Sequence, residues 1–324
     1  MTRLFHGAGR SSFEDDRSLS SASVGDHQSV QDFRYSGEMV ESDPAWRRAV
    51  DYVASAAAGP PLDPSLRVTL QFHPDRLVGD RLLLEKLAVD GVYRSQFETG
   101  TSNGGLTAHP GGDRWRGESR LFGGAYDALP PDRRPKYGAL NHRRRPAGGS
   151  ARFGSAHFRL TAKVLPRITF CYPDSVNERV TVGTAEHLSL ITLTERDESV
   201  GRVDVLDDYI EAHVHGRLRL DRDVDALVLD PCYRGTPVEV AAAALPLAVE
   251  WHHGFRLPAD GFDRYQDYRG RHIPEVARQV ADAYTDDGWL HARAVGDAAR
   301  TGDWAAQDLK YLWHCLARFG SPAP

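Results

Sequence analysis

The chain has 324 residues, of which 41% are hydrophobic and 26% charged, a balance typical of soluble globular proteins that bury a sizeable core. Its formal net charge of −5 excludes the strongly basic footprint of a dedicated nucleic-acid-binding protein. The sequence has no apolar run near the roughly 20 residues of a membrane span and no apolar signal-peptide core, which predicts a cytoplasmic protein without a membrane partner.

The first part of the chain predicts an arm followed by alternating elements. Residues 1–40 are rich in Ser, Asp, Gly and Gln and predict a poorly ordered N-terminal arm. Residues 100–125 hold many glycines and predict a long loop near a functional site. Between them lie two segments with helical spacing and one that alternates as a strand. The expected helices are residues 43–53 and 82–89, and the expected strand is residues 68–72.

The remainder divides into a strand-rich part and a helical part. Short strands are expected at residues 138–141, 158–160, 168–172, 203–205, 210–214 and 227–229. After Pro237 the spacing becomes helical, at residues 238–247, 274–284, 290–299 and 304–319. Because helices and strands follow one another without a regular βαβ rhythm, the chain is predicted to be α+β. We expect a core over residues 41–236 and a helical C-terminal extension, residues 237–324, packed on it.

Sequence motifs of several common enzyme classes are absent. There is no Gly-x-x-x-x-Gly-Lys loop, no Gly-x-Gly-x-x-Gly behind a strand, no His-Glu-x-x-His and no Gly-x-Ser-x-Gly elbow. Kinases, Rossmann dehydrogenases, zincins and α/β-hydrolases are therefore excluded. Cys171, Cys232 and Cys315 are an odd number without Cys-x-x-Cys spacing, and predict neither a disulfide framework nor a thiolate metal site.

Two polar clusters interrupt strand-like sequence. Arg, Gln, Glu, Ser and Asn side chains crowd beside glycines in residues 93–104. Glu211, His213 and His215 fall on one face of the strand expected at residues 210–214, because successive side chains of a strand alternate. A solvated face would tolerate these groups, but their crowding favours a binding site.

Four segments of the chain resemble known families. They read Tyr-Gly-Ala-Leu (137–140), Phe-Gly-Ser (153–155), Arg-Ile-Thr-Phe with Asp-Ser (167–175), and Tyr-Ile-Glu-Ala-His-Val-His-Gly (209–216). Over most of residues 65–320 the chain resembles a bacterial family of unknown function. Over about residues 90–230 it is similar, at the level of motifs, to toxin-like domains attached to some phage head proteins, which are usually grouped with ADP-ribosyltransferases.

The order Arg94, Ser155, Glu211 is similar to the Arg/Ser/Glu order of one clade of ADP-ribosyltransferases. The resemblance implies a split β-sandwich core and NAD as the substrate. It implies that Arg94 holds a phosphate or ribose of NAD, that Ser155 supports the nicotinamide-ribose pocket, and that Glu211 accepts a hydrogen bond from the ribose 2′-hydroxyl. His213, on the same face as Glu211, is expected to position or deprotonate the acceptor.

The polar run after Arg94 is assigned to the same NAD pocket, as Gln96, Thr101, Ser102 and Asn103. Here the sequence departs from the clade, which has Ser-Thr-Ser where this chain has one serine, and usually Glu or Gln where it has His213. The resemblance implies NAD-dependent ADP-ribosyl transfer, or NAD hydrolysis without an acceptor. It leaves the acceptor open among protein, nucleic acid and small molecules, and the role open among toxin, defence factor and modifying enzyme.

Two other classes of function stay open. A metal-dependent hydrolase would use His213 and His215, which share a strand face, with carboxylates such as Glu211. The adjacent pair His252 and His253 points in opposite directions on a strand and is less suited to one metal. A non-enzymatic binding module would instead use the glycine-rich loop for recognition.

Overall fold

The computed structural model describes residues 44–100 and 107–322. The arm expected over residues 1–40 lies outside the described residues, and so do Thr101, Ser102 and Asn103. The described residues all belong to one compact unit. Among them, no helix is both long and apolar enough to cross a membrane.

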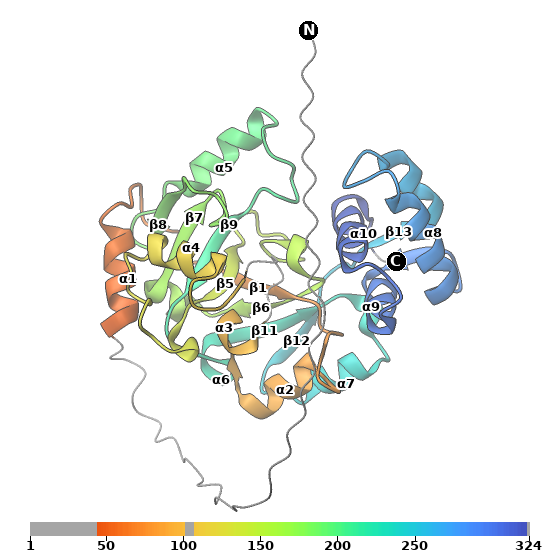
Figure 1. Ribbon diagram of the computed structural model, residues 1–324, viewed down its shortest axis with the longest axis horizontal. Helices are drawn as coiled ribbons and strands as arrows, with labels where there is room; N and C mark the ends of the chain where they lie inside the picture. Colours follow the sequence, from red (N-terminus) through yellow and green to blue (C-terminus); the bar gives the residue numbers. More distant parts are fainter. Residues whose placement is uncertain (1–43, 101–106, 323–324) are drawn as a thin grey trace, which may run out of the picture. The chain divides into compact units, whose positions relative to one another are not determined.

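An eight-stranded mixed sheet forms the centre of the structure, with the order β12-β11-β6-β1-β5-β9-β7-β8 (Figure 1). Neighbouring strands are antiparallel except β11 and β12, which are parallel. Helices surround the sheet, which confirms the α+β class. The strands are β1 (Val68–Phe72), β5 (Lys136–Leu140), β6 (Ala156–Leu160), β7 (Ile168–Tyr172), β8 (Thr181–Thr184), β9 (Ile210–Val214), β11 (Val224–Leu229) and β12 (Ala248–Trp251).

Smaller elements complete the described chain. Three two-stranded sheets pair β2 (Leu77–Val78) with β3 (Arg81–Leu82), β4 (Val92–Tyr93) with β10 (Leu218–Arg219), and β13 (Arg256–Pro258) with β14 (Trp289–His291). The α-helices are α1 (Pro44–Ala54), α2 (Leu83–Asp90), α3 (Gln96–Thr99), α4 (Asp113–Leu121), α5 (Leu190–Ser199), α6 (Leu220–Asp223), α7 (Pro237–Ala243), α8 (Ile273–Tyr284), α9 (Ala292–Thr301) and α10 (Ala306–Phe319). The 3-10 helices are η1 (Pro131–Arg133), η2 (Ala151–Phe153), η3 (Ala162–Arg167), η4 (Pro231–Tyr233) and η5 (Ala259–Tyr265).

The two faces of the central sheet differ in chemistry. In β9, Ile210, Ala212 and Val214 join the main hydrophobic core. Glu211 and His213 alternate with them and therefore point to the opposite face. This second face also carries polar residues of the neighbouring strands and is the one on which the candidate site lies.

Helix α4 lies in a segment that the sequence predicts to be a loop. Its buried residues are Arg114, Glu118 and Leu121, which follow helical spacing. Because two of the three are charged, the helix has little apolar periodicity for a sequence pattern to detect. Leu121 and Phe122 pack with Ala49 of α1 in a second, smaller core.

Two further expectations are corrected. Residues 203–205 form a turn rather than a strand, because Asp204 accepts hydrogen bonds from the Leu206 backbone and from Arg318. The region after residue 236 is not only helical, since it contributes β12 to the central sheet. The expected helices α8 and α10 are confirmed there, and Figure 1 shows them grouped with α9 near β13.

Candidate functional site

A cleft opens on the polar face of the sheet, where β1, β5 and β9 lie side by side. Its cavity volume is about 100 Å³, and it opens to solvent on one side. The walls come from segments far apart in the sequence, including α4, η2 and α10. The lining residues are Gln71, Tyr93, Gln96, Arg114, Tyr137, Gly138, Ala139, Ser150, Arg152, Phe153, Asp174, Val176, Tyr209, Glu211 and Lys310.

Glu211 lines this cleft from the middle of β9, and its side chain is only 9% exposed. His213 lies behind it, with Nε2 2.9 Å from Oε1 of Glu211. Burial by itself would raise the pKa of Glu211, but the hydrogen bond from His213 and the charge of Arg114 lower it below its ordinary value. Glu211 is therefore an ionised carboxylate facing the cleft.

A chain of hydrogen bonds fixes the orientation of His213. Burial lowers the pKa of His215 well below its ordinary value, so this ring is neutral. Tyr126 Oη lies 2.7 Å from Nδ1 of His215, and Thr169 Oγ1 lies 2.9 Å from Nε2 of His215 and 3.2 Å from Nδ1 of His213. One arrangement satisfies every group: Tyr126 donates to His215, His215 to Thr169, Thr169 to His213, and His213 to Glu211. His213 is thus a positioning group for Glu211.

Helix α4 places a cation beside Glu211. The Arg114 guanidinium lies 4.0 Å from the centre of the Tyr137 ring, and its Nη1 donates to Ser175 Oγ at 3.3 Å. One turn later, Glu118 accepts hydrogen bonds from Tyr137 Oη at 2.9 Å and from Arg134 Nη1 at 2.7 Å. These contacts hold the aromatic wall of the cleft and the guanidinium in one arrangement.

The three residues of the Arg/Ser/Glu order do not meet in space. Arg94 directly follows β4, is 47% exposed at its side chain, and pairs on the surface with Asp90 at 2.8 Å. Ser155 is buried before β6, with its hydroxyl 3.3 Å from Tyr233 Oη. Of the described residues assigned to NAD from the sequence, Gln96 and Glu211 line the cleft and Arg94 and Ser155 do not. His213 has no exposed surface and lies behind Glu211, so it is not placed to contact an acceptor.

Much of the polar run that starts at Tyr93 serves a helix end. Ser95 caps α3, and Ser95 and Glu98 form a reciprocal capping box. Ser, then Glu three residues later, is the signature of that motif. The crowding of polar residues here is therefore partly structural, and only Tyr93 and Gln96 of the described run face the cleft.

Three cations of the cleft are not among the site residues expected from the sequence: Arg114, Arg152 and Lys310. Arg152 directly precedes the Phe-Gly-Ser motif (153–155), which was the available signal for it. Arg114 gives no such signal, because the helix α4 that carries it has no apolar stripe. Lys310 gives no local signal, because only the packing of α10 brings it to the cleft.

Several polar atoms at the cleft have no partner. Among the buried side-chain atoms of the described chain, Gln96 Oε1, Arg114 Nε, Ser150 Oγ and Arg152 Nε make no hydrogen bond. All four residues line the cleft. Since buried polar atoms of native proteins are nearly always paired, four such atoms in one place point to a polar ligand.

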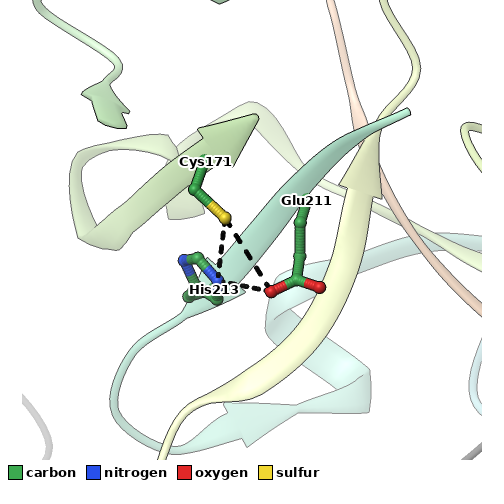
Figure 2. A group of neighbouring side chains, drawn as sticks. All are labelled: Cys171, Glu211 and His213. Carbon is green, nitrogen blue, oxygen red and sulfur yellow. Dashed lines mark hydrogen bonds and ion pairs between the residues drawn. The ribbon is translucent and has the colours of Figure 1, made fainter. Parts of the chain in front are cut away.

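Cys171, Glu211 and His213 also form a compact group (Figure 2). The Cys171 Sγ atom lies 3.9 Å from His213 Nε2 and 4.0 Å from Glu211 Oε1. Three ligand atoms at these separations, one of them sulfur, fit a transition-metal ion such as zinc. His215 is excluded from this group by its bonds to Tyr126 and Thr169, and His252 by its bond to the Ser155 carbonyl at 2.8 Å.

Comparison with known proteins gives a family without an assigned activity. The model of one family, described as "Protein of unknown function (DUF3626)", matches residues 67–206 and 192–319. A comparison with curated proteins finds no match. Because the two matched segments together span most of the chain, the protein belongs to the family described as protein of unknown function DUF3626.

Proposed function

We propose that the protein cleaves the bond between nicotinamide and ribose in NAD, and transfers ADP-ribose to an acceptor or to water. The observation that carries the proposal is Glu211, a carboxylate held ionised by His213 at the floor of a cleft with cationic and aromatic walls. Tyr93, Tyr137, Phe153 and Tyr209 offer aromatic surface for a base or nicotinamide ring. The Arg114 and Arg152 guanidiniums match phosphate oxygens.

The proposed reaction proceeds through a cationic ribose. The bond between C1′ of the ribose and the nicotinamide nitrogen breaks, and its electron pair leaves with neutral nicotinamide. Glu211 accepts a hydrogen bond from the 2′-hydroxyl, and its charge stabilises the positive charge that develops on the ribose. Water or the acceptor then attacks C1′, and its proton is released to solvent. The carboxylate is needed most in the transition state, which is the condition for catalysis.

The proposal changes the assignment of one residue. Arg114 takes the phosphate-binding role that the resemblance gave to Arg94, because Arg114 lies in the same cleft as Glu211 and has an unpartnered Nε. As part of the same proposal, we keep the expected likeness between the core of this protein and the split β-sandwich of ADP-ribosyltransferases. The support for that likeness is the position of Glu211 in the strand that the resemblance gave it, on the polar face of a central sheet.

Nicotinamide release from NAD by the purified protein tests the proposal. We expect Glu211→Gln to lower the rate at least about 100-fold, because the amide keeps the shape but loses the charge. Glu186→Gln is the matched control, since Glu186 is exposed and outside the cleft, and should keep the wild-type rate. Urea denaturation establishes that both variants are folded. A wild-type protein without nicotinamide release, or full activity in Glu211→Gln, rejects the proposal.

A second candidate function is a metal-dependent hydrolase, favoured by the grouping of Cys171, Glu211 and His213. Three protein ligands would leave a coordination position for water or substrate. The same preparations separate the two functions. A metal centre requires about one equivalent of bound transition metal, its loss in Cys171→Ser, and inactivation by a chelator. If Glu211 cleaves NAD without a metal, nicotinamide release continues in the presence of the chelator.

A further inference from the structure

Two cations, Arg152 and Lys310, line one wall of the cleft, and a third, Arg269, shares a carboxylate with Arg152. Arg152 of η2 and Arg269, which precedes α8, both donate to Asp207, at 2.7 Å and 2.6 Å. Lys310 of α10 lines the cleft beside Arg152. Within the described residues, the Lys310 side chain makes no hydrogen bond or ion pair.

The guanidiniums keep unused hydrogen-bonding capacity. Nε of Arg152 and Nε of Arg269 are buried and make no hydrogen bond within the described chain. The two carboxylates that line the cleft do not pair directly with these cations: Asp174 accepts a hydrogen bond from Tyr209, and Glu211 accepts one from His213. The group Arg152, Arg269 and Lys310 carries three positive charges against the single charge of Asp207, and is therefore positively charged overall.

The excess of positive charge around Lys310 affects its pKa. Burial lowers its pKa below the ordinary value, and the charges of Arg152 and Arg269 lower it further. Like charges held close together in a partly buried place destabilise the fold unless an anion joins them. Such places recur where proteins bind phosphate groups.

The packing of α10 holds Lys310 at the cleft. Trp313, which follows Lys310 by three residues and so lies one helical turn away, donates from Nε1 to the carbonyl of Ala151 at 3.0 Å. Ala151 is the residue before Arg152. Near the end of the same helix, Arg318 donates to Asp204 at 2.9 Å. The C-terminal helix is thus fixed to η2 and to the loop that carries Asp207.

We propose that Lys310 and Arg152 form a phosphate-binding subsite, so that the C-terminal helix completes the cleft whose floor is Glu211. The subsite binds the phosphate groups of the substrate while Glu211 acts on a distant part of it. Taking these phosphates as the pyrophosphate of NAD rests on the proposed function, whereas the subsite itself rests on the group of cations and on its unpartnered Nε atoms. Lys310 lies outside residues 90–230, so the resemblance gave no role to it.

Calorimetric titration with inorganic pyrophosphate tests the subsite without any turnover. We expect the wild-type protein to bind pyrophosphate, and Lys310→Met and Arg152→Gln each to weaken binding at least tenfold, because each removes a cation from the group. Lys86→Met is the matched control, since Lys86 is an exposed lysine on another helix, α2, and should bind as the wild type does. ADP-ribose, titrated into the same proteins, should also bind more weakly to Lys310→Met and Arg152→Gln than to the wild type and to Lys86→Met.

The outcomes for the subsite and for the proposed function are distinct. Wild-type protein that does not bind pyrophosphate, or Lys310→Met that binds it as tightly as the wild type, overturns the subsite. Arg152→Gln removes a partner of Asp207, so urea denaturation is used to check that this variant folds. If Arg152→Gln does not fold, the pyrophosphate affinity of Lys310→Met alone decides whether the subsite exists. Glu211→Gln should bind pyrophosphate at least as tightly as the wild type, because it removes a negative charge from the same cleft. Pyrophosphate binding without nicotinamide release supports the subsite and rejects the proposed function alone.

Discussion

At the scale of single residues, alternation in one strand accounts for the centre of the site. The sequence places Glu211 and His213 on one face of a strand, and the structure confirms both the strand and the shared face. Their burial and their direct hydrogen bond could not be predicted, because they depend on α4 and on the turn after it, which cover this face. The same cover makes His213 a partner of Glu211 instead of a group that contacts substrate.

Gly154 shows how one residue of a recognised motif can be required for packing. A Cβ atom at this position would lie 2.1 Å from the carbonyl carbon of Phe72 in β1. We expect Gly154→Ala to lower the free energy of unfolding by about 3 kcal/mol or more, because backbone atoms cannot move aside as a flexible side chain can.

Urea denaturation measures this effect. Gly201→Ala is the control, since Gly201 has φ of 60° and no atom within 4 Å of a Cβ there, and it should cost only about 1 kcal/mol. Equal losses in the two variants would contradict the close contact with Phe72.

At the scale of elements, α4 determines the shape of the cleft. It lies across the polar face and supplies both Arg114 and Glu118. A helix that buries charged residues has no apolar stripe, so its sequence does not distinguish it from a polar loop. The short α3 is the opposite case, because its capping box is visible in the sequence and was interpreted as part of a binding site.

The ion pair between Glu118 and Arg134 is expected to stabilise α4 on the sheet. Both side chains are almost fully buried and their charged atoms lie 2.7 Å apart. Burial raises the pKa of Glu118 to about 7, so the pair is ionic above that pH. At about pH 8 we expect Glu118→Gln to lower the free energy of unfolding by about 3 kcal/mol, because it leaves a buried guanidinium without its counter-charge.

Asp113→Asn in the same helix is the control, because its pair with Arg116 is exposed and contributes less than about 0.5 kcal/mol. Thermal or urea unfolding of the two variants gives the comparison. If Glu118→Gln is as stable as Asp113→Asn, the buried pair is not what holds α4 in place.

At the scale of the whole molecule, buried titratable groups determine how stability depends on pH. Burial lowers the pKa of His157 and of His314 to about 3, while the unfolded chain binds a proton at each below about pH 6.5. Unfolding therefore takes up protons between about pH 3 and 6.5, and stability falls as the pH is lowered through this window. Asp75 opposes this between about pH 4 and 6, because burial raises its pKa to about 6.

For these three groups the net uptake is about one proton, or roughly 1.4 kcal/mol per pH unit between pH 4 and 6. Free energies of unfolding from urea titrations at several pH values measure the slope. His314→Gln should flatten it by about one proton, whereas His187→Gln, at an exposed position, should leave it unchanged. A slope that does not respond to His314→Gln would show that this histidine is not neutral and buried in the folded protein.

The sequence by itself determined the α+β class, most strands of the central sheet, and the polar face of β9, because these follow from local periodicity. It also pointed to Glu211 as the residue around which a site is built. Only the tertiary structure decided which cations accompany Glu211: Arg94, chosen from its order in the chain, lies on the surface, while Arg114, Arg152 and Lys310 line the cleft. The physical reason is that a cleft is formed by contacts between segments far apart along the chain. The side chain of Lys310 reaches the cleft only because a helix distant in the sequence packs beside it. The residues that neighbour Lys310 in the sequence therefore do not indicate this position.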